Sequence, residues 1–408
     1  MTDDDHKQLK SRADDGWFER LCAWADKFDI PEAVLPRDKA ELLVLQKLLL
    51  FRKGFALLPA EIGQLGNLQE LILSLGNLTE LPAEIRQLNN LQKLDLTGNQ
   101  LNTLPATIGQ LDNLQKLSLG DNQLVILPVA IGQLGNLQEL DLSDNPLTAL
   151  PATIGQLGNL QKLSLGGNRL TTLPAEIGQL HNLQELILCE DQLTTLPVEI
   201  GQLGNLQTLY LLGHQLTALP NSIGQLSNLQ DITIDSHLLL ELIDMVPHLP
   251  KLKYLSLRNL TTLPAEIGQL IKLQTLDLSK NQLTALPTEI GQLGNLQKLD
   301  LSGNKLTTLP DTIGQLGNLQ KLDLSGNRLT TLPDTIGQLD NLQELDLSGN
   351  KLTTLPESMD QLRKLQIINL RDNMLGYHLV FLPNSIQRLY HKRNGALEIW
   401  LNDPVAER

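Results

Sequence analysis

Residues 91–113 read LQKLDLTGNQLNTLPATIGQLDN, and this stretch is the unit from which most of the chain is built. Its copies are anchored on the first leucine of an L-x-x-L-x-L run. Leu45 opens a faint first copy, and with it 15 copies follow one another up to the one that begins at Leu365. The step is 23 residues throughout, except for 21 residues between Leu252 and Leu273. A fixed period of this size indicates a solenoid, in which each repeat packs only against its neighbours.

Each copy carries the pattern of one short strand followed by a return segment. Leu94 and Leu96 alternate with polar residues, which is the period of a half-buried strand. The return segment L-P-x-x-I-G-Q-L begins with a proline, which suits the start of a helical turn, and its glycine discourages a long helix. We therefore expect one or two turns of 3₁₀ or irregular helix. Because strands lie closer together than such turns, the sequence predicts an α/β solenoid, a leucine-rich-repeat horseshoe with a parallel concave sheet.

An asparagine recurs eight residues after the anchor, where the chain turns off the strand. An amide side chain both donates and accepts, so stacked asparagines can satisfy backbone groups that the bend leaves unpaired. We interpret these residues as a structural ladder, not as a binding site. Its members are Asn99, Asn122, Asn145, Asn168, Asn281, Asn304, Asn327, Asn350 and Asn373.

The flanks of the repeats differ from the unit. Residues 1–13 are charged and expected to be flexible, and residues 14–44 contain aromatic and apolar residues at helical spacing. That helix is predicted to cap the apolar end of the solenoid, with a separate partner-binding helix as the alternative. The repeats are predicted over 45–373, irregular at 229–272, and a C-terminal cap over 374–408.

Composition and charge exclude several classes of function. The net charge of −14 argues against nucleic acid, because nucleic-acid binders present a basic face. Cys22 and Cys189 are too few for a disulfide framework. The acidic start carries no secretory signal, and no apolar run is long enough to insert in a membrane. We expect a cytoplasmic protein, and delivery into a host cell by a non-cleaved signal stays open.

The outward strand residues change character between Leu183 and Leu257. Elsewhere they are mostly Glu, Lys, Asp, Ser or Gly, which predicts a bland polar face. Here apolar, aromatic and arginine residues replace them, and an apolar cluster on a polar face usually marks a contact site. The alternative is that tyrosine simply suits a strand. The predicted partner-binding patch consists of Ile187, Cys189, Tyr210, Leu212, Tyr254 and Arg258.

The sequence contains no nucleotide-binding, zinc-protease or paired C-x-x-C motif, so no catalytic residue, metal or cofactor is expected. One alternative concerns Asp191, His214 and His237, which occupy the asparagine position on three successive copies and would stack if each filled it. Shared metal ligation there, or a Cys189–His214 nucleophile pair, is the less favoured reading. The simpler interpretation is that the sequence of the turn has changed and each side chain fills the asparagine position and bonds to the backbone.

The segment LPVAIGQLGNLQELDLSDNPL at residues 127–147 resembles the 23-residue leucine-rich repeats of intracellular proteins. These include plant Ras-group-related proteins, animal Ras-binding suppressor scaffolds and the repeat regions of bacterial Roco proteins. The resemblance implies a non-enzymatic scaffold that binds a protein partner, in some members a small GTPase or another signalling protein. The chain lacks the GTPase domain of Roco proteins and the catalytic domain of repeat-bearing effector ubiquitin ligases. A bacterial effector that acts on a host protein is the alternative function.

Overall fold

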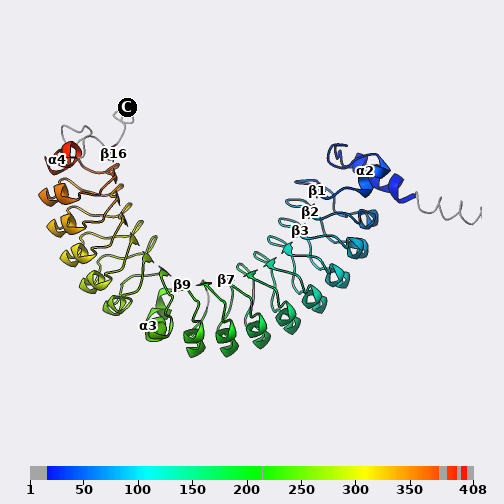
Figure 1. Cartoon of the computed structure of the whole chain (residues 1–408), viewed down its shortest axis with the longest axis horizontal. Helices are drawn as coiled ribbons and strands as arrows, with labels where there is room; N and C mark the ends of the chain where they lie inside the picture. The colour runs from blue at the N-terminus through cyan, green and yellow to red at the C-terminus, as the bar shows by residue number, and fades with distance from the viewer. Residues whose placement is uncertain (1–15, 214, 376–383, 393–396, 402–408) are drawn as a thin grey trace, which may run out of the picture. The chain divides into compact units, whose positions relative to one another are not determined.

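The computed structural model describes residues 16–213, 215–375, 384–392 and 397–401. The chain divides into two compact units. The first unit contains Met1–Leu209 together with Gly213–Leu226, and the second contains Tyr210–Leu212 together with Ser227–Arg408. In each unit the strands line the inner side of the curve and the short helical turns the outer side (Figure 1).

In the first unit, neighbouring strands pair in parallel and residues one repeat apart lie side by side, as Lys93 does beside Lys116. This register places every inward leucine above its equivalent in the previous copy, and these leucines are almost completely buried. The strands are β1 Lys47–Leu49, β2 Glu70–Ile72, β3 Lys93–Asp95, β4 Lys116–Ser118, β5 Glu139–Asp141, β6 Lys162–Ser164 and β7 Glu185–Cys189. Strand β8, Thr208–Leu212, begins in this unit and ends in the second.

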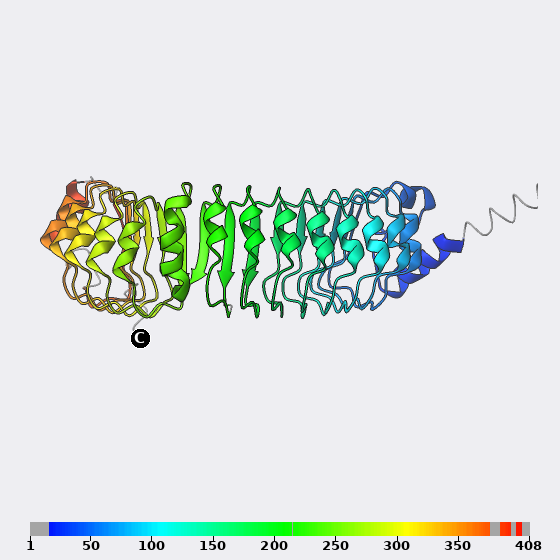
Figure 2. The ribbon, with the colours of Figure 1, turned by 90° about the horizontal axis from the view of Figure 1, so that it is seen from below.

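Each return segment of the first unit forms a single 3₁₀ helix, as predicted, and Figure 2 shows these turns in a row. A proline with extended backbone stands directly before each one, for example Pro151 at φ −69°. The isoleucine of each turn is buried because it points back toward the leucines. The turns of the first unit are η1 Ala60–Gln64, η2 Ala83–Gln87, η3 Ala106–Gln110, η4 Val129–Gln133, η5 Ala152–Gln156, η6 Ala175–Gln179, η7 Val198–Gln202 and η8 Asn221–Gln225.

An N-terminal helix over residues 16–27 precedes the repeats. Its buried side includes Leu21 and Ala25, both with no exposed surface. Trp24 packs its ring 4.9 Å from that of Phe55, which belongs to the first copy. A short second helix, α2 Lys39–Leu43, starts at Asp38, whose side chain accepts two backbone hydrogen bonds.

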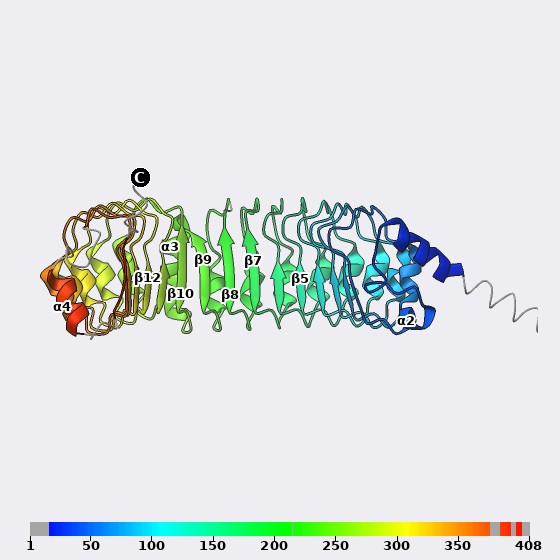
Figure 3. The ribbon, with the colours of Figure 1, turned by 90° about the horizontal axis from the view of Figure 1, so that it is seen from above.

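The second unit repeats the same architecture, and Figure 3 shows its strands from the side opposite to Figure 2. Its strands are β9 Asp231–Asp235, β10 Tyr254–Arg258, β11 Thr275–Asp277, β12 Lys298–Asp300, β13 Lys321–Asp323, β14 Glu344–Asp346, β15 Ile367–Asn369 and β16 Glu398–Trp400. Its regular turns are η11 Ala265–Gln269, η12 Thr288–Gln292, η13 Asp311–Gln315, η14 Asp334–Gln338 and η15 Glu357–Gln361.

One copy in the second unit has a true helix in place of the usual turn. After β9 the chain enters η9 Ser236–Leu238, α3 Leu239–Met245 and η10 Val246–His248. Helix α3 buries Leu239, Leu242, Ile243 and Met245. The C-terminal helix α4, Asn384–Lys392, packs on η15, where Arg388 pairs with Glu357 and Asp360.

Among the described residues, no helix is both long and apolar enough to cross a membrane.

Candidate functional site

The asparagines at the strand-to-turn bend hold the backbone of successive copies together. In a typical rung, Asn145 accepts a hydrogen bond from the backbone N–H of Leu124 at 3.0 Å. Its amide nitrogen donates to the carbonyl oxygens of Leu119 and Leu142 at 3.0 and 3.2 Å. The side chain is 3% exposed, so these bonds satisfy backbone groups that water does not reach. The hydrogen-bonding groups of such an asparagine are used within the fold, so the side chain is not free to bind a ligand.

Asp191 occupies the same position in its own copy, but with a carboxylate in place of the amide. It is 3% exposed, and neither carboxylate oxygen has a hydrogen-bond partner within the described part of the chain. Burial raises its pKa to about 7, against the opposing influence of the nearby backbone N–H groups of Leu170 and Asn168. These N–H groups lie near the carboxylate without reaching hydrogen-bonding geometry.

His237, a member of the less favoured metal-ligation alternative, does not occupy the asparagine position. His237 is exposed in η9, because the chain enters a helix directly after β9 and makes no asparagine-type bend. The expectation that it fills the ladder position is therefore wrong. His214 lies outside the described residues. Within the residues that the structure describes, no group of three His, Cys, Asp or Glu side chains is arranged to hold a metal ion.

The six residues of the predicted patch all point outward from their strands and are half-buried. Ile187 and Cys189 belong to β7 in the first unit. Tyr210, Leu212, Tyr254 and Arg258 belong to the second unit.

In the second unit, Tyr254 and Arg258 converge on a residue that the sequence analysis did not single out, Asp277 on β11. Arg258 forms an ion pair with Asp277 at 2.8 Å, and the hydroxyl of Tyr254 lies 3.4 Å from the same carboxylate oxygen. Ser256, 1% exposed, donates a third hydrogen bond at 3.1 Å. The tyrosine and the arginine are thus held in fixed positions on the strand face.

The electrostatics of this cluster keep Asp277 ionised. Burial acts to raise its pKa, but hydrogen bonds from Arg258 and Ser279 outweigh burial and lower the pKa to about 2. The pKa of Tyr254 is raised, first by burial and then by the negative charge of Asp277, with a further contribution from Tyr210. The phenol of Tyr254 therefore stays neutral at ordinary pH and is available as a hydrogen-bonding group.

A hollow of about 180 Å³ opens beside this cluster in the second unit. Tyr254 and Leu299 give it an apolar wall, while aspartates and lysines alternate along the rest. Asp323 belongs to the charged part of the lining, and its pKa is raised by burial and by the neighbouring Asp300 and Asp346. The hollow is lined by Tyr254, Thr275, Asp277, Lys298, Leu299, Asp300, Lys321 and Asp323.

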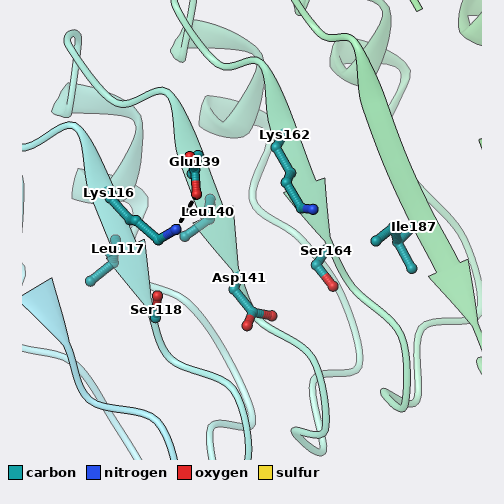
Figure 4. Close-up of a pocket in the computed structure, with 9 residues that line it drawn as sticks. All are labelled: Lys116, Leu117, Ser118, Glu139, Leu140, Asp141, Lys162, Ser164 and Ile187. Atoms are coloured by element: carbon teal, nitrogen blue, oxygen red, sulfur yellow. Dashed lines mark hydrogen bonds and ion pairs between the residues drawn. The ribbon is translucent and has the colours of Figure 1, made fainter. Parts of the chain in front are cut away.

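The first unit has a larger cavity, of about 300 Å³, on its own strand face (Figure 4). The cavity lies on strands whose outward residues predicted a bland polar face. Small residues on β4 and β6 leave room on both sides of Asp141, and Lys116 pairs with Glu139 along one edge. At one repeat position the small Ser118 and Ser164 alternate with the larger Asp141, and this pattern in the sequence could have revealed the cavity. The lining consists of Lys116, Leu117, Ser118, Glu139, Leu140, Asp141, Lys162, Ser164 and Ile187.

Comparison with known proteins gives the family of this architecture. The family described as leucine-rich repeat region matches residues 60–142, 108–192 and 241–327, and the family described as leucine rich repeat matches 317–375. No curated protein sequence matches the chain.

Solved structures give close likenesses. A leucine-rich repeat protein of Leptospira interrogans is 41% identical, with a TM-score of 0.68, over 89% of this chain and 98% of that one. The plant peptide hormone receptor RGFR1 in complex with RGF2 is 28% identical, with a TM-score of 0.52, over 88% of this chain and 67% of the receptor. A TDR receptor is also 28% identical, with a TM-score of 0.55, over 88% and 61%.

Proposed function

Because this chain belongs to the leucine-rich repeat family, we propose that it is a non-enzymatic scaffold that binds another protein on the strand face of its repeats. Proteins of this family typically act as interaction scaffolds, and RGFR1 is solved in complex with RGF2. The strand face of this chain offers outward side chains on a backbone that the leucines and asparagines hold rigidly. Preorganised side chains lose little conformational entropy on binding.

The observation that carries the proposal is the cluster of Tyr254, Arg258 and Asp277 in the second unit. Tyrosine and arginine are the residues most enriched where interfaces concentrate their energy. Here both are half-buried and tied to one carboxylate, and the hollow beside Tyr254 provides a recess for a partner side chain. Tyr210 lies close enough to influence the pKa of Tyr254, so it extends the surface. We assign the partner-binding surface of the second unit to Tyr210, Leu212, Tyr254 and Arg258, and Ile187 and Cys189 to that of the first.

A capture experiment with a matched control tests this assignment. The wild-type chain, a Tyr210→Ala/Tyr254→Ala variant and a Lys47→Ala/Lys93→Ala control are used to capture proteins from a lysate of the source organism. The control removes two lysines of the first-unit strand face that lie outside both recesses. We expect a partner that binds the wild type and the control but not the tyrosine variant.

The captured partner is then purified and its dissociation constant measured. Loss of two interface anchors predicts at least about tenfold weaker binding for the tyrosine variant. A partner that binds the tyrosine variant and the wild type equally well would show that the surface lies elsewhere. Matching thermal melts of the three proteins ensure that a loss of binding is not a loss of folding.

A further inference from the structure

The cavity of the first unit has an unused hydrogen-bond acceptor among its lining residues. Oδ1 of Asp141 accepts hydrogen bonds from the backbone N–H and the hydroxyl of Ser143, at 3.0 and 2.7 Å. Oδ2 of the same carboxylate receives no hydrogen bond from any residue that the structure describes. The Ser143 bonds fix the direction of the carboxylate, so Oδ2 is held in place without a donor of its own.

Two serine hydroxyls flank this carboxylate. The parallel register places Ser118 of β4 and Ser164 of β6 on either side of Asp141, and Figure 4 shows the three in a row. Ser118 is only 8% exposed, yet within the described chain its hydroxyl makes no hydrogen bond. Ser118 lines the cavity, so its hydroxyl is available to a group that enters there.

Gly120 places no side chain against the carboxylate of Asp141. A Cβ atom at Gly120 would lie 3.2 Å from Oδ2 of Asp141 and 3.0 Å from the Ser143 hydroxyl. The cavity volume of about 300 Å³ lies at the lower limit for small-molecule pockets. A volume of this size suits one long side chain better than a cofactor.

The charges around the cavity leave Asp141 as the uncompensated group. Lys116 pairs with Glu139, and Lys162 pairs with Glu185 at 2.9 Å. The hydrogen bond to Glu185 raises the pKa of Lys162, so this pair stays charged and internally neutral. With the two pairs cancelling, the net charge at the cavity is that of the Asp141 carboxylate.

We propose that this cavity receives the ammonium group of a lysine side chain of the protein partner. An ammonium group has three donors and no acceptor, which matches the carboxylate oxygen of Asp141 and the hydroxyls of Ser118 and Ser164. Ile187 supplies an apolar wall for the methylene stem. Arginine suits the site less well, because its planar fork is best matched by two free carboxylate oxygens and Asp141 offers one. This inference rests on the proposed function and names one group of the partner.

The test uses a probe that does not depend on knowing the partner. Nα-acetyl-lysine N-methylamide is titrated into the full chain labelled at isoleucine methyl groups, and the Ile187 signal is assigned from an Ile187→Val variant. We expect a saturable shift of the Ile187 signal, no shift with the norleucine analogue, and a weaker shift with the arginine analogue.

Variants then locate the binding group. Asp141→Asn keeps an acceptor for Ser143 but removes the charge, and we expect at least about tenfold weaker binding, as for the loss of a charge-assisted hydrogen bond. Ser164→Ile fills the cavity with the residue that occupies the equivalent position at Ile187, and it should abolish binding. Asp95→Asn is the control, since Asp95 stands at the same repeat position on β3 and lies outside the lining.

Three outcomes would overturn the proposal. One is an Ile187 signal that does not respond to the lysine probe. Another is equal binding by wild type and Asp141→Asn. The third is a stronger response to the glutamate analogue, which would make Lys116 and Lys162 the binding groups. None of these touches the tyrosine surface of the second unit, so failure here and failure in the capture experiment are separate results.

Discussion

Asp191 shows what one atom changes in the asparagine ladder. In an asparagine rung the nitrogen donates to two carbonyl oxygens, as it does in Asn168 with Leu142 and Leu165. A carboxylate in this position brings negative charge toward those acceptors, and burial raises its pKa to about 7 from 3.8. The folded chain therefore holds a proton that the unfolded chain has released between about pH 4 and pH 7.

The sign of the resulting pH dependence follows from that excess of protons. Because the folded state binds more protons in this window, its stability falls as the pH rises from about 4 to about 7, and the full penalty remains above that range. Asp191→Asn should restore the donors and stabilise the first unit by about 1 kcal/mol or more at pH 8, with little effect near pH 4. Thermal melts at the two pH values measure this. An equal effect of the substitution at both would contradict it.

A matched substitution reverses the change. Asn145→Asp places a carboxylate in a regular rung of the same unit. We expect it to destabilise the first unit at pH 8 more than at pH 4, the mirror image of Asp191→Asn. If both substitutions shift stability in the same direction at pH 8, the charge in the ladder position is not the cause.

At the scale of the 3₁₀ turn, the recurrent glycine is required because the next turn packs too closely for a side chain. Its own φ angle does not require glycine. A Cβ at Gly155 would come within 2.5 Å of the carbonyl oxygen of Glu176 in the next turn. Among the residues that the structure describes, nothing lies within 4 Å of the same position at Gly158, three residues later. The first glycine sets how closely consecutive turns approach, whereas the second has no such constraint.

These two glycines make a matched pair for experiment. Gly155→Ala forces neighbouring turns apart and should cost about 1–3 kcal/mol, the usual range for overpacking. Gly158→Ala should be neutral or slightly stabilising, because alanine restricts the unfolded chain. Chemical denaturation monitored by circular dichroism compares the two. Equal destabilisation would mean that local helix preference, and not the approach of the next turn, decides the effect.

The strand and the turn of each copy could be predicted from the sequence because both are set by a local pattern repeated many times. The alternation of Leu94 and Leu96 with polar residues determines the strand, and the proline after it determines the turn. The candidate sites were less accessible. Arg258 pairs with Asp277 across two copies that are 21 residues apart instead of 23, so the regular repeat does not predict the pair. The cavity at Asp141 depends on the small residues of the two neighbouring strands, which no single copy reveals.

At the scale of the whole chain, stability is distributed along a line. Each copy contacts only its neighbours, and the chain divides into two compact units. Such a chain need not unfold in a single step, since a local defect weakens the copies around it more than distant ones. Tryptophans serve as reporters, with Trp17 and Trp24 before the first repeats and Trp400 on the last strand.

We expect urea unfolding to show more than one transition. In a Trp400→Phe background, fluorescence reports the N-terminal helix, and in a Trp17→Phe/Trp24→Phe background it reports β16. Adding Gly155→Ala should lower the urea midpoint in the first background and leave the second nearly unchanged. Midpoints that move together would show that the whole chain unfolds cooperatively.

The near identity of consecutive copies has a consequence for how this chain can change in length. Residues 296–318 and 319–341 differ at two positions only, and the strands on either side meet them in the same register. Unequal exchange between the corresponding stretches of coding sequence would add or remove 23 residues at once and leave every junction as it was. Length here can vary in whole steps without passing through a misfolded intermediate. The copy that contains α3 lacks this freedom, because the sequence of its return segment, residues 236–250, does not match those of its neighbours.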